Sequence, residues 1–165
     1  MKENIDQLIE ALRQELEQYG EMLARLDLQQ ELVVRRVSDQ LLDSVSQIEF
    51  QGQAIQGARR NRELSRQKVA RALSLPEEAP FALIIPRIPV DYRPLVNALV
   101  EENNALIMRV QQRSRQNHIL LSRTMELMQR LLGSLFPSAG TTTYSGSGTV
   151  LSAALGSRAM YEAVG

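Results

Sequence analysis

Few residues in this sequence have the types and spacing that catalysis or metal binding requires. The chain has no cysteine and a single histidine, His118, which excludes thiolate zinc sites, cysteine nucleophiles and multi-histidine metal centres. Glu101 and Glu102 are adjacent, so on a helix their carboxylates point in different directions. The stretch Gly146-Ser147-Gly148 lacks the other glycines of a nucleophile elbow or a dinucleotide-binding turn. The sequence therefore predicts no enzyme, no metal site and no cofactor.

The charges balance over the whole chain but not along it. Lys and Arg total 19, as do Asp and Glu, yet residues 1–31 hold eight acids and three bases while residues 32–73 hold eight bases and four acids. The basic run at residues 59–71 invites a nucleic-acid interpretation, but it has no nearby aromatic side chain on which a base would stack. We expect these bases to pair with the acidic first segment instead, and we expect no nucleic-acid partner.

Proline and apolar spacing divide the chain into segments. Five of the six prolines lie within residues 76–94, and the long stretches on either side are rich in good helix formers. In those stretches apolar residues recur every three or four positions, which predicts helices over residues 3–26, 28–73 and 94–135. The break between the first two is placed at Asp27, because an aspartate can cap the start of a new helix, and a break near Gly52 stays open as an alternative.

The segment between the second and third helices is too apolar for a solvated linker. Prolines prevent residues 74–93 from forming one helix, so we expect an extended connector that packs across the helices. Its apolar residues are Phe81, Leu83, Ile84, Ile85, Ile88 and Val90.

These segments predict an all-α fold. The lengths of the second and third helices agree, so we expect an elongated antiparallel three-helix bundle or coiled coil as one domain over residues 1–136. Residues 137–165 form a predicted flexible tail, because their Gly, Ser and Thr content is typical of a linker. Within the tail, residues 150–164 are weakly apolar, which leaves a short helix or a docking peptide as interpretations.

The third helix has a wider apolar face than a two-helix contact requires. Its polar stretch at residues 111–118 divides this face into an early and a late portion. Such an excess of apolar surface, together with three methionines, favours a protein-binding module, although core packing alone would also account for the methionines. The two neighbouring stripes are Leu95, Leu99, Leu106, Val110, Leu121, Met125, Met128 and Leu132, and Val96, Val100, Ile107, Leu120, Leu127 and Leu131.

The third helix also carries the residues of a family resemblance. Asn117-His118-Ile119-Leu120-Leu121, followed by Met125, Met128 and Leu132, resembles the Asn-x-x-Leu-Leu segment of FlgN-type flagellar export chaperones. A weaker similarity lies at Asn104-Ala105-Leu106-Ile107. A tyrosine among glycines at Tyr144-Ser145-Gly146 matches the region after the third helix of that family. The resemblance covers residues 3–148, and the proline-rich connector and the length of the chain after Thr149 depart from it.

The resemblance implies a specific function. Members bind the C-terminal helices of hook–filament junction proteins, the hook-associated proteins, keep them from assembling early and deliver them to the flagellar type III export gate. Within that family we expect Tyr144 to contact the export gate. We expect the client surface to comprise Asn117, Ile119, Leu120, Met125, Leu127, Met128 and Leu131.

Two other functional classes stay open. The same double stripe would serve a structural coiled-coil protein that associates with itself and has no client, and residues 59–71 would serve a helical nucleic-acid-binding protein. A chaperone would show at most weak self-association.

The longest apolar run, residues 81–85, is far too short to cross a membrane, and the start of the chain lacks the features of a signal peptide, so we expect a cytoplasmic protein without membrane insertion.

Overall fold

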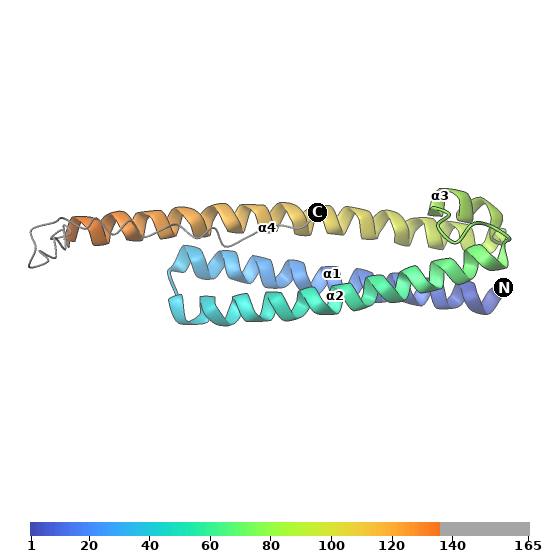
Figure 1. Cartoon of the computed structure of the whole chain (residues 1–165), viewed down its shortest axis with the longest axis horizontal. Helices are drawn as coiled ribbons and strands as arrows, with labels where there is room; N and C mark the ends of the chain where they lie inside the picture. Colours follow the sequence, from blue (N-terminus) through green and yellow to red (C-terminus); the bar gives the residue numbers. More distant parts are fainter. Residues whose placement is uncertain (136–165) are drawn as a thin grey trace, which may run out of the picture. The chain divides into compact units, whose positions relative to one another are not determined.

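The structure is a computed structural model that describes residues 1–135, and every element in that range is helical (Figure 1). The all-α class is therefore confirmed. None of these helices combines the length and apolarity that a bilayer crossing requires. Tyr144 and the predicted tail lie outside the described residues. The elements are α1 (Lys2–Arg35), α2 (Ser38–Ala72), α3 (Phe81–Ile84), the short 3-10 helices η1 (Ile85–Arg87) and η2 (Val90–Tyr92), and α4 (Arg93–Leu135).

The predicted break at Asp27 is wrong, because α1 continues to Arg35. Asp27 does not cap a helix; its carboxylate lies 2.7 Å from the guanidinium Nε of Arg113 in α4. The chain turns instead at Arg36, which adopts the left-handed conformation with φ 58°. The Arg36 and Val37 amides then donate to the carbonyls of Val33 and Leu32, which satisfies the end of the helix in a Schellman motif.

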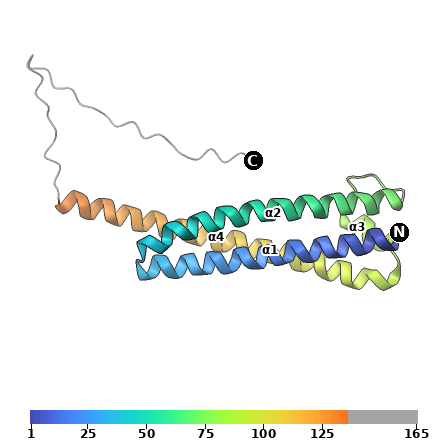
Figure 2. The same cartoon turned by 90° about the horizontal axis from the view of Figure 1, so that it is seen from below.

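Helices α1 and α2 form an antiparallel hairpin, and both views show them side by side (Figures 1 and 2). Gln51 of α2 donates to the Gln18 carbonyl near the middle of α1, while Lys68 donates to the side chain of Gln7 near its start. The hairpin needs no glycine at its turn, and α2 runs unbroken through Gly52. The two helices therefore pack against each other along a single long contact.

Helix α4 runs in the same direction as α1. The Asn103 side chain donates to the Leu12 carbonyl, and the Asn117 side chain donates to the Leu26 carbonyl. Both pairs are separated by 91 positions in the sequence, so the two helices keep one register over fourteen residues. Because α2 is antiparallel to α1, the second and third long helices are antiparallel to each other.

The connector forms part of the core, as the sequence predicts, but it is not simply extended. Its three short helical turns place Ile84 and Ile88 among the least exposed side chains, at 0% and 1%. Leu83 and Val90 are exposed. The prolines thus divide the connector into short turns, from which Ile84 and Ile88 pack into the core. The first core cluster comprises Ile5, Leu8, Ile9, Leu12, Val69, Ala70, Ala79, Ile84, Ile88, Val96 and Leu99.

A second cluster continues the core along α1. Tyr19, Met22 and Leu26 meet Ile55 of α2, with Ile107 of α4 packed against them. Residues 1–124 form one compact unit, and the described residues from 125 to 135 belong to another. The arrangement described above concerns the first unit alone.

Candidate functional site

The predicted client surface lies on α4, and most of its side chains are exposed. Ile119, Met125, Leu127 and Met128 are each between 50% and 62% exposed. Leu131 is 57% exposed and Leu120 is half-buried. The predicted set therefore falls largely on accessible helix surface.

Asn117 is the member of the predicted set that does not lie on this surface. Its side chain is only 2% exposed, and its amide nitrogen donates to the Leu26 carbonyl at 2.7 Å and to the side chain of Gln29 at 3.0 Å. The asparagine of the Asn-x-x-Leu-Leu segment therefore holds α4 against α1. It positions the following turns and is not itself available to a partner.

Arg113 reinforces this contact one turn earlier. Its guanidinium pairs with the Asp27 carboxylate and also donates to the side chain of Gln30. We call Arg113 and Asn117, with their partners on α1, the polar clamp. The polar stretch that interrupts the apolar face of α4 thus contains the residues that bind α1 by hydrogen bonds rather than by apolar packing.

Asn103 makes an equivalent contact fourteen residues before Asn117. It is 6% exposed and donates to the Leu12 carbonyl at 3.0 Å and to the Leu99 carbonyl at 2.9 Å. Compared with a well-packed apolar residue, a buried asparagine in a helix seam lowers stability, but it fixes register and orientation. The two asparagines together define the parallel register of α4 on α1.

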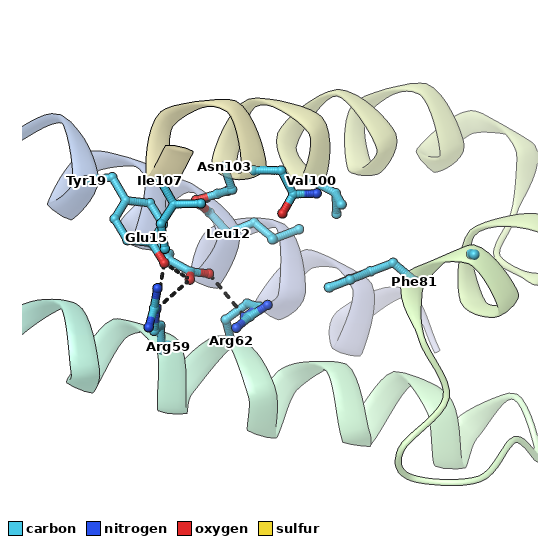
Figure 3. A pocket seen from close by; sticks show the side chains of 11 residues that line it. Leu12, Glu15, Tyr19, Arg59, Arg62, Phe81, Val100, Asn103 and Ile107 are labelled. Atoms are coloured by element: carbon cyan, nitrogen blue, oxygen red, sulfur yellow. Dashed lines mark hydrogen bonds and ion pairs between the residues drawn. The ribbon is translucent and has the colours of Figure 1, made fainter. Parts of the chain in front are cut away.

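A charged cluster lies between α1 and α2 (Figure 3). Glu15 is 3% exposed, and its carboxylate lies 3.1 Å from the Nε of Arg62 and 3.8 Å from the Nε of Arg59. This confirms, for these two arginines, the predicted pairing of the basic run with the acidic first segment. Arg66 behaves differently, because it pairs with Glu63 within its own helix and donates to the Ala79 carbonyl.

Tyr19 completes the charged cluster. Burial raises the pKa of its hydroxyl above the usual range, and a hydrogen bond from Arg59 partly offsets that effect. The phenol therefore keeps its proton at neutral pH and donates to the Glu15 carboxylate at 2.8 Å. Arg59 donates in turn to the phenolic oxygen at 2.7 Å, and its guanidinium lies 5.5 Å from the ring centroid.

The sequence interpretation did not single out Asn103, Arg113 or Glu15. The pattern did contain a sign of the asparagine, because the predicted seam steps from Leu99 directly to Leu106 and leaves one position vacant between them. Asn103 fills that position. Among residues 1–135 no group of three or more His, Cys, Asp or Glu side chains is placed to hold a metal ion.

Comparison with known proteins identifies the family. The family model described as FlgN protein matches residues 1–152, which is most of the chain. The chain belongs to the FlgN family. FlgN proteins are chaperones of flagellar export rather than enzymes, and they bind export substrates, so this general role and class of partner apply here. No curated protein and no solved structure matches the chain.

Proposed function

We propose that this FlgN protein binds the C-terminal helices of hook-associated junction proteins in the cytoplasm, prevents their early assembly and delivers them to the type III export gate. The observation that carries the proposal is the group of exposed apolar side chains late in α4, above all Ile119, Met125, Leu127 and Met128. Tyr144 stays a prediction for the gate contact.

The geometry of α4 suits a helical client. At 100° per residue, Leu120 and Leu127 share one stripe, while Leu121, Met125 and Met128 share its neighbour. A helix this apolar on two adjoining faces is normally covered by other helices. A client helix would cover one stripe by the helix-in-groove mode, in which apolar side chains at i, i+3, i+4 and i+7 supply most of the binding energy.

Two features of this segment favour release as well as capture. Methionine side chains adapt to differently shaped partners, so Met125 and Met128 would accept more than one client surface. The segment also carries Arg123 and Arg130 with only Glu126 opposing them, which favours clients with acidic residues beside their apolar face. Because such rim charges act mainly on association rate, binding would be fast and reversible.

Met128→Glu tests the proposal most directly. A charge in the middle of the client contact should abolish capture of purified hook-associated proteins by the full chain, measured by calorimetry. The matched control is Met108→Glu, because Met108 lies on the same helix, is 68% exposed and is outside the proposed surface. This variant should bind clients normally, and circular dichroism should show unchanged helicity for both.

Three outcomes would contradict the proposal. Loss of helicity in Met128→Glu would place Met128 in a folded core. Equal loss of capture in both variants would remove the surface assignment. A stable oligomer of the wild-type chain that dissociates only in Met128→Glu, with no client bound, would establish the self-associating coiled coil in its place.

A further inference from the structure

A cavity of about 480 Å³ lies beside the charged cluster in the first unit. It is bounded by α1, α2, α4 and the connector, and Figure 3 shows the side chains that line it. Exposed residues on its rim, Ala82 and Asn104, leave it open to solvent. Its volume lies within the range of roughly 300–1,000 Å³ that is typical of small-ligand sites.

The two arginines of the cluster are partly exposed, at 44% for the side chain of Arg59 and 28% for that of Arg62. Arg59 and Arg62 both approach Glu15 through Nε, as the dashed lines of Figure 3 show for the cluster. Within residues 1–135 the terminal nitrogens of these two guanidinium groups donate no hydrogen bond to a protein acceptor. Two positioned guanidinium groups with free terminal donors form a fork-like site for a carboxylate or a phosphate.

The charge of the lining selects between these anions. Glu15, Arg59 and Arg62 are the charged side chains that line the cavity, so it carries one net positive charge. A carboxylate bears a single negative charge and neutralises it. A phosphate monoester carries a charge of about −1.5 to −2 at neutral pH and would leave the cavity with an excess of negative charge.

The opposite wall carries apolar side chains beside Asn103 and Asn104 of α4. Leu12 is buried, Val100 and Ile107 are half-buried, and Phe81 of the connector extends toward the same space. These side chains favour a ligand with an apolar body, because removing its methylene groups from water favours binding. A fully polar anion would leave these apolar side chains unmatched.

We infer that this cavity binds an apolar carboxylate, a ligand whose carboxylate is received by Arg59 and Arg62 and whose hydrocarbon group packs against Leu12, Val100 and Ile107. The same chemistry is presented by the C-terminus of a peptide that ends in an aliphatic residue and by a medium-chain fatty acid. The site is separate from the proposed client surface and does not depend on it.

Nuclear magnetic resonance of the ¹⁵N-labelled full chain tests the inference with three probes. N-acetyl-leucine represents the peptide terminus, octanoate represents the fatty acid, and N-acetyl-leucinamide is the neutral control. For fragments of this size we expect a Kd on the order of 1 mM. We expect saturable shifts of the Arg59 and Arg62 Nε–H signals with an acid, and binding at least tenfold weaker with the amide. The acid that binds more tightly identifies the source of the carboxylate.

Two variants locate the binding. Arg62→Gln should weaken binding of the acid at least tenfold, but it removes one of the two arginines that pair with Glu15 and can disturb folding. Ala82→Trp avoids this problem, because Ala82 is exposed at the rim and a large side chain there should block the cavity without touching the charges. The matched control is Ala98→Trp, an exposed alanine on α4 outside the lining, which should bind as the wild type does.

The inference is overturned if neither acid gives saturable shifts, if the amide binds as well as the acid, or if Ala82→Trp binds normally. Its failure is distinguishable from failure of the proposed function. Met128→Glu should leave N-acetyl-leucine binding unchanged, and Ala82→Trp should leave capture of junction proteins unchanged.

Discussion

The early and late portions of α4 contain the same kinds of side chain in different surroundings. In the early portion, Val96 and Leu99 are 0% and 7% exposed and belong to a core built from four segments of the chain. In the late portion, Leu127 and Met128 are 62% and 57% exposed. Apolar spacing is thus a property of the whole helix, whereas burial depends on which other segments are present to cover it.

The late portion of α4 presents its apolar side chains to solvent, and an exposed group of apolar side chains on a helix is suited to a partner from another chain. The contrast between the two portions therefore bears on function.

Alanine substitution of one leucine in each portion should give the largest difference. Leu99→Ala removes a buried side chain and should lower the free energy of unfolding by about 2–5 kcal/mol. Leu127→Ala removes an exposed one and should change it by about 0.5 kcal/mol or less. Guanidinium denaturation of the full chain measures both values. Similar losses for the two variants would show that the late portion of α4 is packed in solution and would end the contrast.

Loss of the Asn117 contacts in the polar clamp should have an intermediate effect on the free energy of unfolding. Asn117→Ala removes two hydrogen bonds from a buried position and should destabilise the protein by about 1–2 kcal/mol. The neighbouring variant Gln116→Ala changes an exposed side chain and should be nearly neutral. Urea denaturation compares them. If Asn117→Ala were as neutral as Gln116→Ala, apolar packing alone would hold the two helices in register.

The helices could be predicted from the sequence, but not where the first one ends. Spacing of apolar residues identified three long helices and an apolar connector, because each helix buries one stripe over many turns. The break at Asp27 was wrong because its carboxylate pairs with Arg113, a contact that requires the third helix to be in place. The actual turn uses Arg36 in a left-handed conformation, which a glycine would have signalled and an arginine does not.

The candidate site shows the same limit. Exposure at Met125, Leu127 and Met128 accords with the wide apolar face predicted from the sequence, since that face exceeds what one partner helix needs. The role of Asn117 could not be predicted, because it depends on a register shared with a helix 91 positions away. Glu15 was likewise one acid among eight until α2 placed two arginines beside it.

The smallest expected effect on stability concerns the contact between α2 and the connector that precedes α4. Glu63 pairs with Arg66, which donates to the Ala79 carbonyl and so ties α2 to the connector. The hydrogen bond from Arg66 lowers the pKa of Glu63 below its usual value of 4.5. Stability from this pair is therefore present above that value and is lost as the pH falls through the lowered pKa.

Glu63→Gln should reduce the loss of melting temperature between neutral pH and about pH 3, by about 1–3 °C, because the pair is partly exposed and contributes little. Glu77→Gln is the matched control. Arg71 also lowers the pKa of Glu77 through a hydrogen bond, but both side chains are more than half exposed, and their pair does not hold a buried connector carbonyl. Calorimetry at the two pH values compares the variants. An equal response of both variants would mean that the early portion of α4 is held by its apolar core alone. The difference between the two portions of α4 would then depend on burial, without a contribution from the contact between Arg66 and the connector.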